Sequence, residues 1–306
     1  MLAIRQPGGP SRIDSRPDPG IQSEAEILAR VEAVGARWKR PLCEPSDHGR
    51  LAAMRQITRL LAACLCAVAC AATPATSTRA PTAGAAAIAA ADRSDADRVL
   101  DAGRFPAETL AFFEIRPGMR VAELGAGGGY TTELLARAVG PSGRVYAQNS
   151  KFILERFAEK PWSERLAKPV NALVVRVDRE FDDPLPPEAK ELDAVLIVLF
   201  YHDTVWLGAD RARMNAAVFA ALRSGGIYGV IDHSARPGAG TSETKTLHRI
   251  EESVVIAEIE KAGFQLEAEA EFMRNPSDAR DWNDSPSAAG ERRGTSDRFV
   301  LKFRKP

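Results

Sequence analysis

The residue types with the clearest chemical meaning lie in the segment 121–130, which reads VAELGAGGGY. Glycines occupy four of the five positions from Gly125 to Gly129. Because glycine has no Cβ, such a loop lets the backbone turn sharply and approach a ligand closely. The segment follows a predicted strand and opens a predicted helix, which is the context that a ligand-binding glycine loop requires. A tight strand–helix turn that binds no ligand is the alternative.

The order of the glycines and the acid before them indicate the charge of the ligand. A dinucleotide-binding loop has its third glycine where this chain has Tyr130. Glu123 stands two residues before Gly125. A carboxylate there would repel a phosphate but suits a ligand with an amino or sulfonium group. The loop therefore favours a cationic ligand over a dinucleotide.

A second group of reactive side chains follows two later predicted strands. Tyr201, His202 and Asp203 come after the fourth strand, His233 comes after the fifth, and Arg249 lies further along the next loop. In an open parallel sheet, ligands bind outside the carboxyl ends of the strands. His202 or His233 could act as a general base, Asp203 could orient an imidazole, and Arg249 could hold an anionic group. The alternative is structural: Asp203 caps a helix, and the histidines bond to loop backbone.

The elements that must position these residues alternate between strand and helix. Strands are predicted at 119–124, 144–147, 171–177, 192–199, 227–231, 264–272 and 298–303. Helices are predicted at 130–139, 152–166 with an interruption at Pro161, 211–222 and 250–262, after a helical lead-in at 99–115. Such alternation predicts a parallel sheet with helices on both faces. The last two strands have no helix between them, so we expect them to be antiparallel neighbours at one end of the sheet.

The residues 116–147, RPGMRVAELGAGGGYTTELLARAVGPSGRVYA, resemble motif I and the region after it in class I S-adenosylmethionine-dependent methyltransferases. The resemblance runs from about Val99 to the end of the chain. It is close to a group of predicted bacterial methyltransferases that often carry secretion signals, marked by VLFYHD at 198–203 and by DHSARPGAG and LHRI at 232–240 and 247–250. The resemblance implies a doubly wound, Rossmann-like α/β fold with seven strands in the order 3-2-1-4-5-7-6, the last strand antiparallel.

The same resemblance implies a cofactor, an activity and a set of binding residues. S-adenosylmethionine would be the methyl donor, and the acceptor would be a small molecule or a protein side chain. The loop residues that would bind the cofactor are Glu123, Gly125, Ala126, Gly127, Gly129 and Tyr130. Gln148 and Asn149 stand where the family has an acid that binds the ribose hydroxyls, and Asp178 matches the position that often meets the adenine amino group.

Two other functions stay open at this point. One is a protein that binds S-adenosylmethionine without turnover, which the uncharged Gln148 in place of an acid favours. The other is a protein carboxyl methyltransferase, because residues 127–145 look like that family too.

The first part of the chain reads as processing signals rather than fold. Residues 54–72 have the order of a secretory signal, with Arg55 and Arg59 before a short apolar stretch and small residues after it. Residues 1–53 before Met54 are interpreted as a gene-start artefact or a disordered leader. Residues 73–92, rich in Ala, Thr and Pro, are expected to form a flexible tether. A single methyltransferase domain is expected over 93–306.

The cysteines bear on processing and on metal binding. All four precede Ala71, so no thiolate metal site or disulfide is expected beyond it, and no metal is predicted. Cys70 and Cys64 resemble the lipidated cysteine of bacterial lipoproteins, with plain cleavage after Ala71 or Ala72 as the alternative. We expect an exported protein, periplasmic or anchored on the periplasmic side of the membrane, and a cytoplasmic one if the signal is not used. The formal charge of zero argues against nucleic acid as a partner.

Overall fold

The computed structural model describes residues 83–306. The predictions for 1–53 and 54–72, lipidation of Cys64 or Cys70 included, lie outside the described residues, as do residues 73–82 of the expected tether. In the described part of the chain, every helix is too short or too polar to cross a membrane.

A seven-stranded sheet forms the centre of the domain, with its strands in the order β3-β2-β1-β4-β5-β7-β6. Strand β7 pairs antiparallel with both β5 and β6, and the pairs among β1 to β5 are parallel. The predicted strand order and the antiparallel last strand are therefore confirmed. The strands are β1 Arg120–Leu124, β2 Arg144–Asn149, β3 Val174–Asp178, β4 Leu192–Val198, β5 Leu222–His233, β6 Gln265–Glu269 and β7 Arg298–Arg304.

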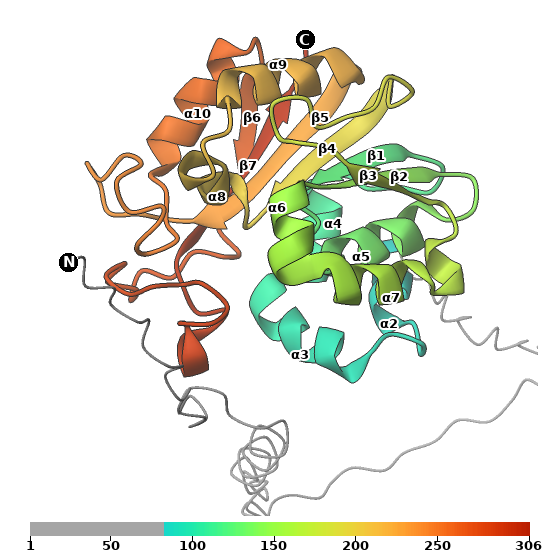
Figure 1. Cartoon of the computed structure of the whole chain (residues 1–306), viewed down its shortest axis with the longest axis horizontal. Coiled ribbons are helices and arrows are strands. Elements are labelled where there is room, and N and C mark those ends of the chain that lie inside the picture. The colour runs from blue at the N-terminus through green and yellow to red at the C-terminus, as the bar shows by residue number, and fades with distance from the viewer. Residues whose placement is uncertain (1–82) are drawn as a thin grey trace, which may run out of the picture. The chain divides into compact units, whose positions relative to one another are not determined.

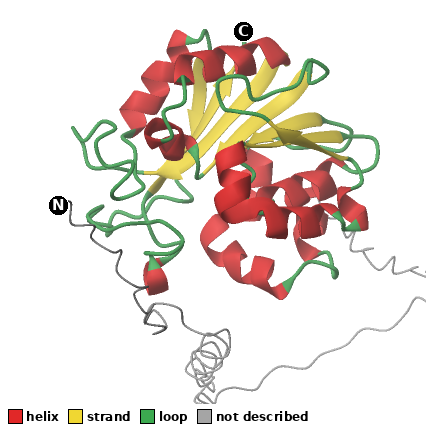
Figure 2. Cartoon of the chain, viewed as in Figure 1, coloured by secondary structure: helices red, strands yellow, loops and turns green. Residues whose placement is uncertain are grey.

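Two groups of helices lie against the sheet (Figures 1 and 2). The first group is α2 Ala83–Ala89, α3 Asp95–Arg104, α4 Pro106–Phe112, α5 Tyr130–Val139, α6 Lys151–Ile153 and α7 Glu159–Leu166. The second group is α8 Tyr201–Trp206, α9 Arg211–Ala221 and α10 Glu252–Lys261. A π-helical turn, Leu154–Ala158, joins α6 to α7, and 3-10 turns lie at Pro169–Asn171 and Gly290–Arg292.

Side chains alternate along the strands and so build an apolar layer on each face of the sheet. Ala122, Leu124 and Val195 belong to the layer that α9 and α10 complete. Val121 and Leu196 belong to the layer that α2, α4 and α5 complete. Because both faces are covered at the centre of the sheet, β4 is apolar almost throughout, whereas the edge strand β6 alternates between exposed and half-buried residues.

Three local features differ from the sequence predictions. Helix α2 extends the folded part into residues expected to be tether, because Ala87 packs against the core. The interruption predicted at Pro161 takes the form of the π-helical turn Leu154–Ala158, which ends three residues before the proline. Strand β5 begins at Leu222 and runs through Gly225, whose φ of +70° accompanies an irregularity in pairing with β4.

Candidate active site

The glycine loop connects β1 to α5 and is closed at both ends but open in its middle. Gly125, Gly127 and Gly129 have φ of +66°, +54° and +80°, which is the region that glycine adopts most easily. A Cβ added at Gly125 would lie 2.5 Å from Phe200, and one at Gly129 would lie 2.5 Å from Trp162 of α7. At Gly127 nothing lies within 4 Å of such a Cβ. The loop therefore leaves open space for a ligand beside Gly127.

Two buried amides at the end of β2 hold this loop in place. The Gly125 N–H donates to Gln148 Oε1 at 3.0 Å, and the Gly127 N–H donates to Asn149 Oδ1 at 2.8 Å. Gln148 Nε2 donates in turn to the Arg179 carbonyl, and Asn149 Nδ2 donates to the Gly127 carbonyl. Both side chains are fully buried. Parallel pairing of β1 and β2 sets Gln148 opposite Leu124, immediately before the loop.

The sequence-based role of these amides therefore needs correction. We expected Gln148 and Asn149 to present hydrogen-bonding groups to the cofactor ribose. In the structure their amide groups bond to backbone atoms, which leaves neither side chain facing outward.

Glu123 lies on β1 below the loop, with only 3% of its surface exposed. Its carboxylate accepts a hydrogen bond from the Thr132 hydroxyl of α5. Burial raises the pKa of Glu123 to about 7, against the opposing effect of that hydrogen bond. In the absence of a ligand the carboxyl group of Glu123 is therefore only partly ionised at neutral pH, and a cation bound beside it would favour the ionised form.

The remaining residues predicted to bind cofactor differ in their exposure. Ala126 is buried within the loop, and its N–H donates to the Gln148 carbonyl. The Tyr130 hydroxyl donates to Asp101 of α3 at 2.6 Å, so this ring fixes α3 to the start of α5. Asp178 ends β3 with 46% of its side chain exposed and pairs with Arg176. Asp178 thus remains accessible at the ligand edge of the sheet.

An ion network under the loop joins three helices. Arg165 of α7 binds Asp97 of α3 through both terminal nitrogens at 2.8 Å, and it binds Glu133 of α5 at 2.6 Å. The Nε of Arg165 donates to the Gly128 carbonyl at 2.5 Å. Glu133 also accepts from Arg137. Because these charges are largely buried and paired, the network fixes the loop against α3 and α7.

On the other side of the loop, the carboxyl ends of β4 and β5 carry the second group of predicted residues. We call this edge, from Leu199 to Asp203 and from Asp232 to Arg249, the rim. Helix α8 lies beside it (Figure 1). Leu199 follows β4 with a φ of +57°, an uncommon conformation for leucine that turns the chain into α8. Such local strain often accompanies functional sites.

Tyr201 does not belong to the reactive part of the rim. Its side chain is fully buried, its hydroxyl donates to Glu258 of α10 at 2.8 Å, and it accepts from Asn215 of α9 at 2.9 Å. Burial raises the pKa of Tyr201 well above its usual value. The prediction of a catalytic role is corrected: Tyr201 connects α8 to α9 and α10, since it occupies the inward side of the first turn of α8.

His202 lies between two carboxylates. Its Nδ1 is 2.7 Å from Asp232 Oδ1, and its Nε2 is 3.1 Å from Asp203 Oδ1. Asp232, fully buried, also accepts the backbone N–H of His202 and of His233. Burial opposes a charge on His202, but the two carboxylates outweigh it and raise the pKa of His202 to about 10. In this structure His202 is therefore protonated at neutral pH and is no general base.

His233 has a different environment and a different charge. Its Nδ1 lies 2.5 Å from Asp284 Oδ2 and 2.9 Å from Ser296 Oγ. Burial lowers the pKa of His233 below its usual value, although Asp284 acts in the opposite direction. The ring packs edge-on against His202, with centroids 5.6 Å apart. Of the two histidines predicted as bases, His233 is thus the neutral one.

A side chain that was not among the predicted site residues, His248, completes a cluster with His202 and Asp203. His248 Nδ1 lies 3.2 Å from Asp203 Oδ1 and 3.2 Å from His202 Nε2. Trp206 Nε1 donates to the same carboxylate oxygen at 2.7 Å. The ligand atoms of the three residues converge within the spacing of a metal site, although the sequence predicted none. The sequence alone places His248 on the rim, and this position could have indicated that His248 belongs to the site.

Arg249 is a structural residue rather than a substrate clamp. It is fully buried, binds Asp278 at 2.8 Å and the Ser234 carbonyl at 3.0 Å, and stacks on Trp282 with its guanidinium carbon 4.9 Å from the ring centroid. These contacts connect the loop after β5 to the loop before β7. The predicted role in holding a substrate anion is corrected, because the guanidinium faces these loops.

An aromatic patch borders the rim. Phe157, in the π-helical turn, has 70% of its surface exposed, and Phe152 of α6 has 37% exposed. Phe152 packs edge-on against both Phe157 and Trp206, with ring centroids 5.9 Å apart in each pair. Trp206 in turn packs edge-on against His248 at 6.4 Å. These three aromatic side chains, named the aromatic patch below, form a continuous surface that leads to His248.

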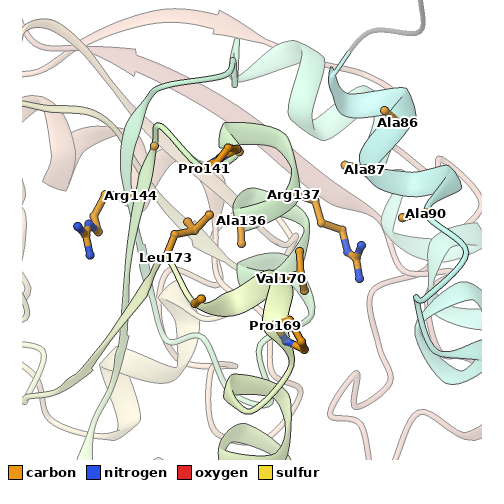
Figure 3. A pocket seen from close by; sticks show the side chains of 13 residues that line it. Ala86, Ala87, Ala90, Ala136, Arg137, Pro141, Arg144, Pro169, Val170 and Leu173 are labelled. Atoms are coloured by element: carbon orange, nitrogen blue, oxygen red, sulfur yellow. The ribbon is translucent and has the colours of Figure 1, made fainter.

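A separate cavity of about 690 Å³ opens at the other edge of the sheet. Side chains of α2 and α5 line it together with the turns before β2 and β3, including Ala86, Arg137, Pro141, Arg144 and Val170 (Figure 3). Those turns precede the amino ends of the strands, whereas the glycine loop and the rim follow the carboxyl ends. The cavity therefore takes no part in the site.

Comparison with protein families gives one match. A sequence model of the protein-L-isoaspartate(D-aspartate) O-methyltransferase family matches residues 90–167. That span contains β1, the glycine loop, α5, β2 and α7, and it ends before the rim begins. No curated protein matches the chain.

Several solved structures are similar to this chain, all at low sequence identity. A SAM dependent methyltransferase from Aquifex aeolicus has 16% identity over 70% of this chain and 100% of its own, with a TM-score of 0.48. A putative methyltransferase from Haloferax volcanii, in complex with the Trm112 activator, has 17% identity over 69% and 93%, with a TM-score of 0.48. A putative sarcosine dimethylglycine methyltransferase from Galdieria sulphuraria has 17% identity over 67% and 86%, with a TM-score of 0.49.

Proposed function

We propose that this chain is an S-adenosylmethionine-dependent methyltransferase that transfers the methyl group to a small molecule or a protein side chain docked on the rim. One observation carries the proposal: the glycine loop is open at Gly127, at the same edge of the sheet as the rim. Strands β1 and β4 are neighbours, with Leu124 beside Ile197, so loop and rim follow adjacent strand ends. A cofactor at one and an acceptor at the other would meet at this edge.

The residues present fit a cofactor along the loop. Gly127 leaves its Cβ direction empty, Phe200 covers Gly125, and Asp178 is accessible at the end of β3. S-adenosylmethionine supplies an activated methyl group on a sulfonium. Arg165 and the Gln148 and Asn149 amides hold the glycine loop in place, which would fix the position of that methyl group for an acceptor on the rim.

Charge on the rim favours particular acceptors. His202 is cationic in this structure, whereas His233 is neutral. A positive charge at the position of His202, which Asp203 and Asp232 favour, stabilises an acceptor whose nucleophile is negatively charged. A proton released from an acceptor has His233 as the nearby neutral histidine. The aromatic patch next to His248 offers an apolar surface for the rest of the acceptor. We therefore favour an acceptor with an apolar or aromatic portion beside an acidic nucleophile.

Calorimetric titration of the full chain with S-adenosylmethionine, and with its demethylated product, tests the proposal. Gly127→Arg should abolish binding, because the side chain fills the open edge of the loop. Gly290→Arg is the matched control, since Gly290 also has a positive φ and open space around its Cβ but lies between β6 and β7. Unchanged cofactor affinity in Gly127→Arg, with Gly290→Arg behaving like wild type, would refute this site.

Binding without turnover is the second candidate function. The Gln148 amide favours it, because it bonds to the loop and leaves no acid at the expected ribose position. Incubating the protein with methyl-labelled S-adenosylmethionine and a cell extract separates the two functions. Label transferred to extract components supports the enzyme, and binding without transfer supports the binding protein.

A carboxyl acceptor is a more specific version of the enzyme. It is supported by the family match over residues 90–167, which covers the cofactor side of the domain. Methyl esters are labile to base, whereas methyl groups on nitrogen are retained. Loss of the transferred label after mild alkaline treatment would therefore support a carboxyl acceptor, and a stable label would exclude it.

A further inference from the structure

We infer that His202, Asp203 and His248 form a binding site for a divalent transition-metal ion of the zinc type. Within the described residues 83–306, these three side chains place one nitrogen or oxygen atom each within 4.8 Å of the others. Two imidazole nitrogens and one carboxylate oxygen are donors that zinc takes in catalytic sites with an open position.

The distances between the three donor atoms fit a metal ion. Asp203 Oδ1 lies 3.1 Å from His202 Nε2 and 3.2 Å from His248 Nδ1, and the two nitrogens are 3.2 Å apart. With metal–ligand bonds of about 2.0–2.1 Å, donor atoms lie about 3.3 Å apart in a tetrahedral site and about 2.9 Å apart in an octahedral one. The observed triangle falls between these values, so an ion fits without moving the side chains far.

The surrounding residues supply the orientation that metal ligands need. Asp232 lies 2.7 Å from His202 Nδ1, so its carboxylate fixes this proton and directs the Nε2 lone pair toward Asp203. A carboxylate–histidine pair of this kind is the usual support of a metal-bound imidazole. Trp206 Nε1 donates to Asp203 at 2.7 Å and holds the carboxylate in place. His202 and Asp203 therefore each have an outer hydrogen-bond partner.

Charge and exposure also agree with a cation. When a metal ion replaces the proton on His202 Nε2, Asp203 and Asp232 give the cluster two negative charges, and Asp232 has no exposed surface. A divalent ion would balance these charges. The side chains of Asp203 and His248 are 14% and 22% exposed, so the site is reachable from the rim. Trp206 contacts both Asp203 and Phe152, so the proposed metal site lies next to the aromatic patch.

The role of the ion rests on the proposed function. The ion would bind and activate the nucleophilic group of the methyl acceptor. A metal-bound hydroxyl or thiol loses its proton to water more readily because the cation lowers its pKa. The oxygen or sulfur then donates an electron pair to the methyl carbon. The carbon–sulfur bond of the sulfonium breaks, and its electron pair stays on sulfur as a neutral thioether. One proton is released for each methyl group transferred, and no oxidant or reductant is needed.

Binding of Zn²⁺ and Co²⁺ to the full chain tests the site directly. The four cysteines must first be blocked with iodoacetamide, because thiolates would compete for both ions. Calorimetry should then show one equivalent bound, and Co²⁺ should give the visible absorption of a low-symmetry site. Asp203→Asn and His248→Ala should each weaken binding by more than about 100-fold, since loss of an outer partner alone costs about 10–100-fold.

Three controls keep the outcomes distinct. His48→Gln removes the one histidine outside the rim and should bind metal like wild type. Asp232→Asn, which keeps the shape of the outer partner, should weaken binding by about 10–100-fold. Thermal unfolding and S-adenosylmethionine affinity, measured on each variant, show that the fold and the glycine loop are intact.

Wild-type protein that binds no ion, or ligand variants that bind as well as wild type, would overturn the site. Metal binding in a chain that has no affinity for S-adenosylmethionine would instead refute the proposed function and leave the site standing. Transfer of label to an extract should fall when the metal is removed with a chelator and return when Zn²⁺ is added. Transfer that persists without metal overturns the role in activating the acceptor.

Discussion

Replacing the buried Glu123 by Gln should make the ligand-free protein more stable at neutral and alkaline pH. Glu123 is 3% exposed, and its pKa is raised from 4.5 to about 7 because burial disfavours the charged form. A carboxyl group whose pKa is raised in the folded state contributes its full stability below the unfolded pKa and loses it as pH rises through the folded pKa. Gln keeps the acceptor for the Thr132 hydroxyl and carries no charge at any pH.

The magnitude follows from the difference between the two pKa values. A shift from 4.5 to about 7 corresponds to about 3 kcal/mol in total, at about 1.4 kcal/mol per unit. Between about pH 5 and about pH 8, proton linkage lowers the free energy of unfolding of the wild type by about 2.5 kcal/mol. The Gln variant does not undergo this loss. The difference in the free energy of unfolding between variant and wild type should therefore rise by about this amount across that range.

Urea denaturation at several pH values measures this difference, and a second variant provides the opposite sign. Glu133 is also buried, but Lys168, Arg137 and Arg165 hold its pKa below the usual value against the effect of burial. Glu133→Gln should destabilise the protein above the unfolded pKa of a glutamate, with the penalty fading as pH falls. If the difference between Glu123→Gln and wild type stays flat from about pH 5 to about pH 8, the assignment of a raised pKa to Glu123 is wrong.

Three further perturbations follow from the structure. Arg165→Met should lower the free energy of unfolding by about 3–5 kcal/mol in urea denaturation, because it leaves buried carboxylates without their cation, whereas Lys151→Met at an exposed ion pair should change it by less than about 1 kcal/mol. Gln148→Ala should cost about 1–3 kcal/mol by the same assay and weaken S-adenosylmethionine binding in calorimetry, since the Gly125 N–H loses its partner. Phe157→Ser, at an exposed position, should leave stability within about 0.5 kcal/mol but raise the KM for the acceptor in the labelled-transfer assay; an unchanged KM would remove the aromatic patch from the acceptor site.

The framework of the site could be predicted from the sequence, because periodicity and glycine placement determine it. Helix α5 was predicted at its observed bounds, and the strand order places the glycine loop and the rim at one edge. The direction of single side chains on that edge could not be predicted. Tyr201 and His202 are adjacent in sequence, yet one enters the contact with α9 and α10 and the other enters the cluster with Asp232.

Contacts between residues far apart in the sequence also could not be predicted from the sequence pattern. His202 and His248 are 46 positions apart, and the path between them depends on a loop without periodicity. His248 has a φ of +53°, which an L-residue adopts only when its surroundings compensate for the strain. Gln148 was expected to face a ligand, but hydrogen bonds that satisfy buried loop N–H groups decided its direction instead.

The position of β7 has a consequence for how the protein is made. The strand that the chain completes last, Arg298–Arg304, lies inside the sheet between β5 and β6, and Phe299, Leu301 and Phe303 have no exposed surface. During synthesis, β6 has no partner and β5 has one unpaired edge until β7 has been made. The nascent domain therefore exposes an apolar sheet edge from the completion of β5 until the completion of β7, a period when chaperones have access to it.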